Sequence, residues 1–279
     1  MKIQIILEPD LTPDELVEIG LLAEQLDIAG LWVQNYSAGA DPFMSLVPLA
    51  RASRQIQLGV VIVSAFEMHP IKMATSLLTL NEYSGGRASM VIGRGGEWLG
   101  IMGGKYSRSV RRVREAIEIV RLAAQGGGIE KQIDYPGAYY QANYYRTPWV
   151  TENIPAKVYA GVTKDNMLRM GAETADGIML ADLGLPSVVA ERVAFARQAQ
   201  ELSGRDKAEL RINDFLGWHV KEDPAAVYSE ACRELVIRGW LAKYWLTPFL
   251  SDEEADFVVE HKGAFIKAFR ERTGHIEGI

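Results

Sequence analysis

The stretch ASMVIGRGGEW at residues 88–98 decides between the two folds that the rest of the chain allows. It reads as a buried strand followed by Gly93-Arg94-Gly95-Gly96, with Trp98 where the third glycine of a G-x-G-x-x-G turn would stand. A doubly wound dinucleotide-binding sheet carries that turn after its first strand. Here the first predicted strand, residues 3–7, runs into Glu8-Pro9-Asp10, which holds no glycine. The sequence therefore favours a closed (β/α) barrel over an open sheet.

Short β-branched runs alternate along the chain with longer segments of helical periodicity, as in a parallel sheet covered by helices. Capping signals mark the helix starts, of which Thr12-Pro13-Asp14-Glu15 is the clearest. The predicted strands are residues 3–7, 30–34, 57–63, 88–92, 156–160, 177–181 and 210–219. The predicted helices are residues 13–28, 42–53, 70–83, 108–124, 164–174, 187–202, 224–238 and 252–272. Residues 126–149, which open with three glycines, are predicted to be an inserted loop or hairpin in a single domain of residues 1–279.

Composition and charge exclude several classes of protein. The 279 residues are 48% hydrophobic and 24% charged, as in an ordinary globular protein. A net charge of −6 would repel a phosphate backbone, so we expect no nucleic acid partner. One cysteine, Cys232, and four histidines predict neither a disulfide nor a metal site. No apolar run approaches the ~20 residues of a membrane span, so we expect a cytoplasmic protein that does not bind membranes.

In a barrel the active site lies at the C-terminal ends of the strands, where this chain has glycines, hydroxyls and amides. The densest group is Gly93 to Glu97, since glycines let backbone N–H groups approach a ligand and an arginine complements a phosphate. A strand-helix turn with a solvated arginine is the alternative. Glu97 would donate a proton beside a cofactor and would otherwise be a surface carboxylate.

Two other groups allow both a functional and a structural interpretation. Gly161-Val162-Thr163 places N–H groups and a hydroxyl at a helix N-terminus, which is either a phosphate site or an ordinary Thr163 N-cap. Four arginines gather in the helix predicted at residues 108–124, where they form either a solvated basic face or a site that attracts an acidic ligand. These arginines are Arg108, Arg111, Arg112 and Arg114.

Together these segments resemble the bacterial-luciferase-like superfamily of flavin and deazaflavin enzymes. The resemblance is greatest to members that use coenzyme F420, such as the methylenetetrahydromethanopterin reductases. It extends from residue 1 to about residue 182, and the segment L-x-x-x-S-x-G-R at residues 80–87, followed by a strand and G-x-G, is its most specific element. The other matching stretches are residues 21–33, 56–61, 69–70, 92–95 and 154–161. The resemblance implies a TIM (β/α)8-type barrel of the bacterial-luciferase kind.

The resemblance also implies where a cofactor would lie. Val61, Ile62, Val63 and Ser64 would form a bulge beneath the cofactor ring, which the family often builds around a non-prolyl cis peptide. Gly93, Arg94, Gly95 and Gly96 would line the cleft. Ala160, Gly161, Val162 and Thr163 would hold the ribityl-phosphate portion. The arginines from Arg108 onward would attract the polyglutamate tail of coenzyme F420.

This chain departs from the family pattern in two places. Many deazaflavin members have an Asp-His pair after the second strand, whereas this chain has Asn35-Tyr36. We therefore expect Glu97 or Tyr36 to transfer the proton and Asn35 to position a substrate. The second departure is that no eighth strand is recognisable after residue 219. A barrel open at one side would need to be covered by another subunit or by a rearranged helix.

The expected function is that of an oxidoreductase that moves a hydride between coenzyme F420 and a small organic substrate. An FMN-dependent monooxygenase and a non-catalytic flavin-binding protein of the same fold are the alternatives. We expect the chain to form a homodimer, because barrels of this kind usually pair and an incomplete barrel would expose apolar surface.

Overall fold

The computed structural model describes residues 2–37, 39–95, 97–125, 132–151, 154–181, 184–218, 220–228 and 243–271. The chain divides into two compact units, Met1–Phe215 and Leu216–Ile279. The first unit contains the sheet and the second contains short helices. That the whole chain forms a single domain stays a prediction.

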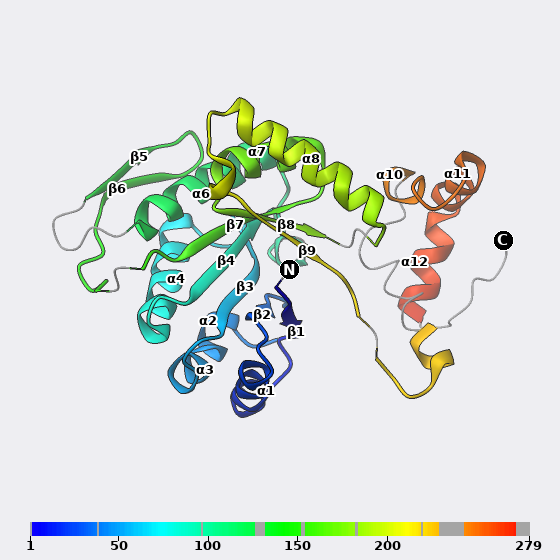
Figure 1. Ribbon diagram of the computed structural model, residues 1–279. Helices are drawn as coiled ribbons and strands as arrows, with labels where there is room; N and C mark the ends of the chain where they lie inside the picture. Colours follow the sequence, from blue (N-terminus) through cyan, green and yellow to red (C-terminus); the bar gives the residue numbers. More distant parts are fainter. Residues whose placement is uncertain are drawn as a thin grey trace. The chain divides into compact units, whose positions relative to one another are not determined.

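A seven-stranded parallel sheet forms the centre of the first unit (Figure 1). Its strands lie in the order β1 (Gln4–Leu7), β2 (Gly30–Gln34), β3 (Gln57–Ser64), β4 (Ala88–Gly93), β7 (Lys157–Val162), β8 (Gly177–Ala181) and β9 (Arg211–Phe215). This order follows the sequence without the reversal of a doubly wound sheet, so the choice of a barrel is confirmed. The two edges also approach each other, since Asn213 Nδ2 on β9 donates to Gln4 Oε1 on β1 at 3.2 Å. No eighth strand pairs with either edge within the described ranges.

Helices alternate with these strands, as the periodicity predicts. They are α1 (Pro13–Gln25), α2 (Pro42–Ser45), α3 (Val47–Ala52), α4 (Pro70–Ser84), α5 (Glu97–Ile101), α6 (Ser109–Ala124), α7 (Asp165–Thr174) and α8 (Pro186–Leu202). The capping box at Thr12 is formed, with the Thr12 N–H 2.8 Å from Glu15 Oε2. The helix predicted at residues 42–53 is two helices, because Pro48 has no N–H to continue the hydrogen bonding of α2.

The predicted insertion contains an antiparallel hairpin, β5 (Ile133–Pro136) and β6 (Gln141–Tyr145). In the second unit, residues 224–228 are helical, and the rest of the helix predicted at 224–238 lies outside the described residues. The helix predicted at 252–272 is α11 (Asp252–Glu260) and α12 (Lys262–Glu271), with α10 (Lys243–Leu246) before them. No helix in the described part of the chain has the length and apolar character that crossing a membrane requires.

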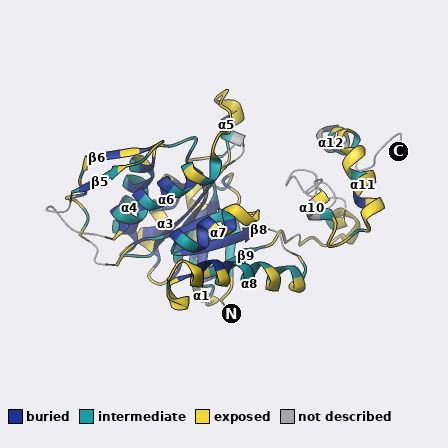
Figure 2. Ribbon diagram, turned by 90° about the horizontal axis from the view of Figure 1, so that it is seen from above, coloured by how far each residue is buried: buried dark blue, intermediate teal, exposed yellow. Residues whose placement is uncertain are grey.

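Large side chains fill the interior of the curled sheet. Figure 2 shows the ribbon of the central strands in the colour of buried residues. Trp32 on β2 and Tyr159 on β7 meet edge to face with ring centroids 5.5 Å apart. Glycines on the neighbouring strands leave room for these rings: a Cβ at Gly59 would lie 2.0 Å from Trp32, and one at Gly177 would lie 2.4 Å from Tyr159. The interior is therefore a packed core, and a ligand has to bind at an end of the strands.

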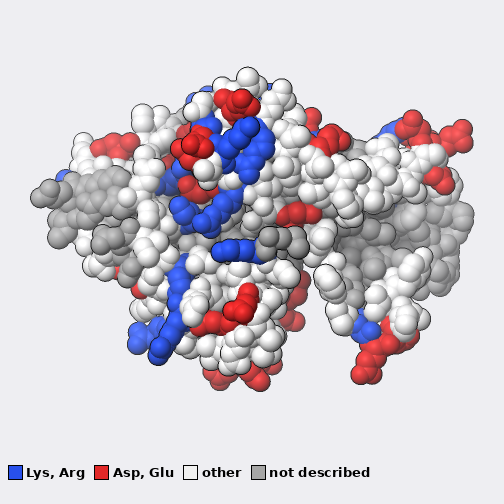
Figure 3. All heavy atoms as spheres, viewed as in Figure 1, with Lys and Arg blue, Asp and Glu red and all other residues white. Residues whose placement is uncertain are grey.

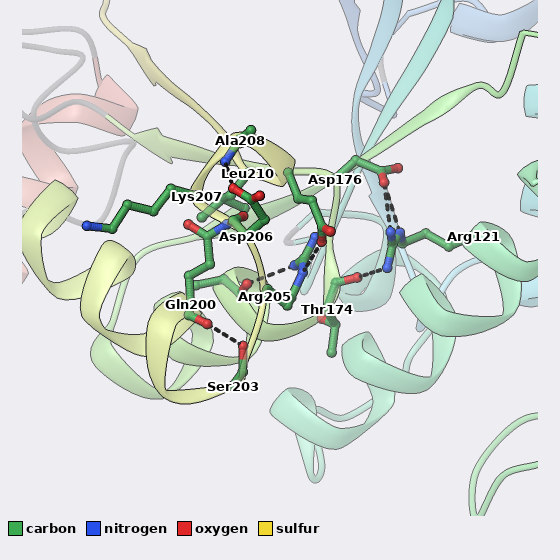
Figure 4. A network of polar contacts seen from close by, with 12 residues as sticks. Arg121, Thr174, Asp176, Gln200, Ser203, Arg205, Asp206, Lys207, Ala208 and Leu210 are labelled. Carbon is green, nitrogen blue, oxygen red and sulfur yellow. Dashed lines mark hydrogen bonds and ion pairs between the residues drawn. The ribbon is translucent and has the colours of Figure 1, made fainter.

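Polar networks hold the N-terminal end of the sheet. Asp176, just before β8, accepts the Val158 N–H at 2.9 Å and pairs with Arg121 of α6 at 2.9 Å (Figure 4). Arg121 and Arg205 also donate to carbonyl oxygens near the end of α7. Acidic and basic side chains lie among one another on the face of the molecule in Figure 3.

Arg87, the last residue of the L-x-x-x-S-x-G-R segment, belongs to this same end. Its guanidinium donates five hydrogen bonds of 2.6–3.0 Å to Ala50 O, Ser53 O, Ser53 Oγ, Ile56 O and Ser84 O. These bonds join the ends of α3 and α4 to the starts of β3 and β4. The most specific element of the sequence is therefore a structural clamp, far from the C-terminal ends of the strands.

Candidate active site

An apolar floor lies at the C-terminal ends of β3, β4 and β7. The pairing of β3 with β4 shifts register between Val60 and Val63, and the Val61–Ile62 peptide is cis. Ile62 is 37% exposed although it stands within a buried strand. A Cβ at Gly93 would lie 2.8 Å from Ile62 Cγ2, and one at Gly161 would lie 3.2 Å from Ile62 Cδ1. The Ile62 side chain thus extends across two glycines, and we call Ile62, Gly93 and Gly161 the mouth floor.

Asn35 adjoins the mouth floor from the end of β2. Its backbone N–H donates to Val61 O at 2.8 Å, and its Nδ2 donates to Ile62 O at 3.2 Å. The side chain therefore holds the bulge of β3 from one side. Tyr36, the next residue, is 41% exposed. Beside them Gln34 Nε2 donates to Glu8 Oε1 at 2.7 Å, so polar groups of β1 and β2 meet at this edge.

The glycine turn after β4 folds onto the loop after β3. Ser64 is fully buried, and its hydroxyl donates to Arg94 O at 2.6 Å while accepting the Phe66 N–H at 3.1 Å. Gly95 has φ +69°, and a Cβ there would lie 2.4 Å from Ser64 Cβ. Gly95 is thus required by the turn itself. Gly96 and the side chain of Glu97 lie outside the described residues.

The loop after β7 presents Thr163 beside the mouth floor. Ala160 and Val162 are buried, so their side chains are not accessible to a ligand. Thr163 is exposed, and the N-cap of α7 is Lys164, whose side chain makes no capping hydrogen bond. The interpretation of Thr163 as an ordinary N-cap is therefore wrong, because α7 begins one residue later than predicted. The Thr163 hydroxyl lies just before the N-terminus of α7 and does not cap the helix.

The structure separates the arginines that the sequence places together on one helix. Arg111 pairs with Glu115 at 3.0 Å, and Arg114 pairs with Glu173 and Glu118. Arg112 instead lies over aromatic rings, with its Cζ 4.4 Å from the Tyr139 centroid and 5.4 Å from that of Phe66. Arg108 is exposed at the N-cap of α6. The sequence did not indicate Tyr139, because it lies in a hairpin turn far along the chain.

Glu115 fastens that hairpin to α6. Its side chain is buried and accepts the N–H groups of Ala138, Tyr139 and Tyr140 at 2.8–3.1 Å. Burial opposes the charged form, but these donors and Arg111 outweigh it and hold the pKa of Glu115 below its ordinary value of 4.5. Tyr140 also donates its hydroxyl to Ala65 O in the loop after β3. The hairpin turn is thereby held against both α6 and the loop after β3.

This lowered pKa predicts a pH-dependent anchor. The carboxylate contributes its full stability above the ordinary pKa of 4.5, and this contribution is lost as the pH falls through the lower pKa of the folded state. We expect the melting temperature to fall more steeply below pH 4.5 in the wild type than in Glu115→Gln. At pH 7 the variant should lose about 1–3 kcal/mol, because an amide accepts the N–H groups less well. Thermal unfolding between pH 3 and pH 7 checks this.

Glu18→Gln, on the exposed face of α1, is the control and should follow the wild type at every pH. Parallel pH profiles for Glu115→Gln and the wild type would show that the Glu115 carboxylate is not a pH-dependent anchor of the hairpin.

Comparison with known proteins agrees with this geometry. A family model described as luciferase-like monooxygenase matches residues 2–276. The 5,10-methylenetetrahydromethanopterin reductase of Archaeoglobus fulgidus is 30% identical over 184 residues, which are 64% of this chain and 53% of that protein. The 4-hydroxyprotoasukamycin monooxygenase of Streptomyces nodosus subsp. asukaensis is 26% identical over 242 residues, 80% of this chain and 64% of that protein. The matches thus span about half to two thirds of these relatives.

Among solved structures, the coenzyme F420-dependent tetrahydromethanopterin reductase of Methanopyrus kandleri is similar with a TM-score of 0.77 at 20% identity. The similarity covers 96% of this chain and 82% of that one. At this identity the likeness shows the fold alone.

Proposed function

Because the chain belongs to the luciferase-like monooxygenase family, we propose that it is an oxidoreductase that transfers a hydride between coenzyme F420 and a small organic substrate. The mouth floor is the observation that carries the proposal. It offers an exposed Ile62 side chain over two glycines, with no side chain on either glycine to lift a flat ring away. The residues present therefore fit an aromatic ring system such as a deazaflavin.

Neighbouring groups support the rest of such a cofactor. Thr163 and the N–H groups at the start of α7 suit a phosphate, because the helix N-terminus carries a partial positive charge. Gly161, in the preceding strand, lets a chain that leaves the ring pass close to the backbone. Ala160 and Val162 would contribute backbone groups only.

The cofactor supplies the hydride chemistry when it is bound, and the protein supplies placement. Ile62 supports one face of the ring, and a substrate would lie on the opposite face within about 3–3.5 Å of the reacting atom. Asn35 keeps the Ile62 carbonyl in place through its 3.2 Å hydrogen bond. The Tyr36 hydroxyl would donate the accompanying proton, with Glu97 as the other candidate donor.

An FMN-dependent monooxygenase is the second candidate. One relative is a monooxygenase, and the floor and the Thr163 region would serve FMN as well as a deazaflavin. A non-catalytic flavin-binding protein is the third, because the described sheet has seven strands rather than eight. A homodimer as the working form stays a prediction.

Titration with the two cofactors tests the proposal. We expect coenzyme F420 to bind about tenfold more tightly than FMN, as measured by quenching of protein fluorescence, since only F420 carries a polyanionic tail in addition to a phosphate. Reduced F420 should also be oxidised when a panel of small carbonyl compounds and imines is added. Equal affinity for both cofactors together with oxygen uptake on reduced FMN would favour the monooxygenase, and tight binding without turnover would favour the binding protein.

A further inference from the structure

A short segment with an exposed apolar tip follows β4, the strand whose last residue is Gly93 of the mouth floor. Residues 97–105 form α5 and return the chain to Tyr106, before α6. Figure 2 shows α5 standing out from the rest of the first unit. Among the described residues, α5 makes no extensive contact with another helix or strand. We call residues 97–104 the flap.

The base of the flap is fastened to the loop after β3. Arg94 Cζ, just before the flap, lies 4.5 Å from the centroid of the Tyr106 ring, just after it. Tyr106 meets Phe66 edge to face with ring centroids 5.3 Å apart, and the Arg94 carbonyl accepts the Ser64 hydroxyl at 2.6 Å. Ser64 pairs with Gly93 where β3 and β4 end. The base of the flap is therefore held beside the mouth floor.

The body of the flap packs on itself. Leu99 is buried, and a Cβ at Gly104 would lie 2.2 Å from Leu99 Cδ1. The Gly104 N–H donates to Leu99 O at 2.8 Å, and the Met102 N–H donates to Trp98 O at 2.9 Å. Gly103 has φ +68°, which lets the chain turn back at this point. The flap thus keeps its shape through its own contacts, as compact functional surface loops do.

The tip of the flap exposes apolar side chains to solvent. Ile101 is 62% exposed and Met102 is 57% exposed. Residues 98–104, with the sequence WLGIMGG, contain no charged side chain. Surface segments are usually polar, and a run of exposed apolar residues in one is typical of a place that binds a ligand or a partner. Removing these two side chains from water would be favourable.

We propose that the flap closes over the ligand on the mouth floor and that Ile101 and Met102 contact an apolar part of the substrate. The inference rests on the proposed function, and it names the substrate class as compounds with an alkyl chain or an apolar ring beside the reacting group. The tip is continuous with the mouth floor through the base at Arg94 and Gly93. Closure would also exclude water from the reacting atoms.

The size of the tip disfavours a protein as its occupant. A stable protein interface buries about 800 Å² on each partner, and two side chains offer only a small part of this area. A small molecule that already lies on the mouth floor needs no more than a few additional apolar contacts. The substrate is therefore the occupant to which the inference commits.

A series of 2-alkanones, from acetone to 2-nonanone, tests the substrate class. With the F420-loaded protein, KM should fall about two- to fourfold for each CH₂ group that the flap covers. Ile101→Gln and Met102→Gln should each raise KM for 2-nonanone about fivefold and leave KM for acetone and the affinity for F420 unchanged. Because both residues are exposed, the melting temperature should change by no more than about 1 °C. Leu202→Gln, at the exposed end of α8, is the matched control and should change none of these quantities.

Amide hydrogen exchange tests the closure of the flap without turnover. Oxidised F420 has no hydride to give to a ketone, so its complex with 2-nonanone does not react. In this complex the N–H groups of Met102 and Gly104 should exchange about tenfold more slowly than with oxidised F420 alone. Acetone should slow the exchange less, and Ile101→Gln should reduce the effect of 2-nonanone.

The outcomes separate this inference from the proposed function. Protection of the flap by 2-nonanone in a protein that transfers no hydride would support the flap and refute the proposed reaction. Exchange that does not respond to 2-nonanone, or the same dependence of KM on chain length in the wild type and both variants, would overturn the inference. Dimerisation or binding to lipid vesicles that Met102→Gln abolishes, with no effect on the alkanones, would assign the tip to another occupant and also overturn it.

Discussion

Replacing Arg87 by lysine is expected to cost about 3 kcal/mol of folding free energy, a large effect for a substitution that keeps the charge. Its guanidinium makes five hydrogen bonds to Ala50, Ser53, Ile56 and Ser84. An ammonium group keeps the charge but has no planar fork, so most of these acceptors would lose their donor. The melting temperature should fall by about 6–12 °C, as measured by circular dichroism or calorimetry.

Arg54→Lys is the matched control for this prediction. Arg54 lies in the same region of the fold, but its side chain is exposed and only its backbone N–H bonds to Glu24. This control should change the melting temperature by no more than about 1 °C, in line with surface substitutions generally. A loss in Arg87→Lys as small as the control's would show that the clamp is not what holds this end of the sheet.

Gly161→Val is expected to weaken cofactor binding about 30-fold, equivalent to ~2 kcal/mol of steric conflict. A Cβ at this position would lie 3.2 Å from Ile62 Cδ1 and 3.3 Å from Val91 Cγ1, so the strand can accept it with small shifts. The two added methyl groups would then occupy the surface of the mouth floor. Cofactor titration by fluorescence quenching measures the loss, and thermal unfolding should show a much smaller change.

Substitutions at two other glycines serve as comparisons for this prediction. Gly95→Val should destabilise the loop itself, because Gly95 has φ +69° and its Cβ would lie 2.4 Å from Ser64 Cβ. Gly263→Ala adds a methyl group to α12 in open space and should leave binding unchanged. If Gly161→Val binds the cofactor as the wild type does, the mouth floor is not where the ring lies.

The sequence was sufficient for the central strands and for most helix starts. Buried strands are short β-branched runs whose length and flanking turns are local features, and a capping box such as that at Thr12 is complete within four residues. One predicted helix, residues 42–53, is two helices in the structure. The prediction gave too little weight to Pro48, which breaks the helix. The seam between β1 and β9 depends on Asn213 and Gln4, which are 209 residues apart, and no local pattern indicates it.

The site was harder to predict, because residues from other elements determine which partner each of its side chains contacts. Arg111 and Arg112 are adjacent in sequence, yet one pairs with Glu115 and the other stacks on Tyr139. Their different surroundings come from the hairpin turn, which Glu115 draws to α6 through three backbone N–H groups. The S-x-G-R segment identified the family correctly, but only the hydrogen bonds of Arg87 show that its part is structural.

Methyl NMR of Ile62 tests the central claim, that the cofactor ring lies on the mouth floor. Ile62 has an exposed side chain at the floor, whereas Ile178 on β8 is fully buried and packs toward Gly171 of α7. On titration with coenzyme F420, the Ile62 δ1-methyl resonance should move strongly upfield in proportion to binding, because it lies over the face of an aromatic ring. The Ile178 resonance should stay in place. Saturable binding of the cofactor with no change at Ile62 would contradict the account.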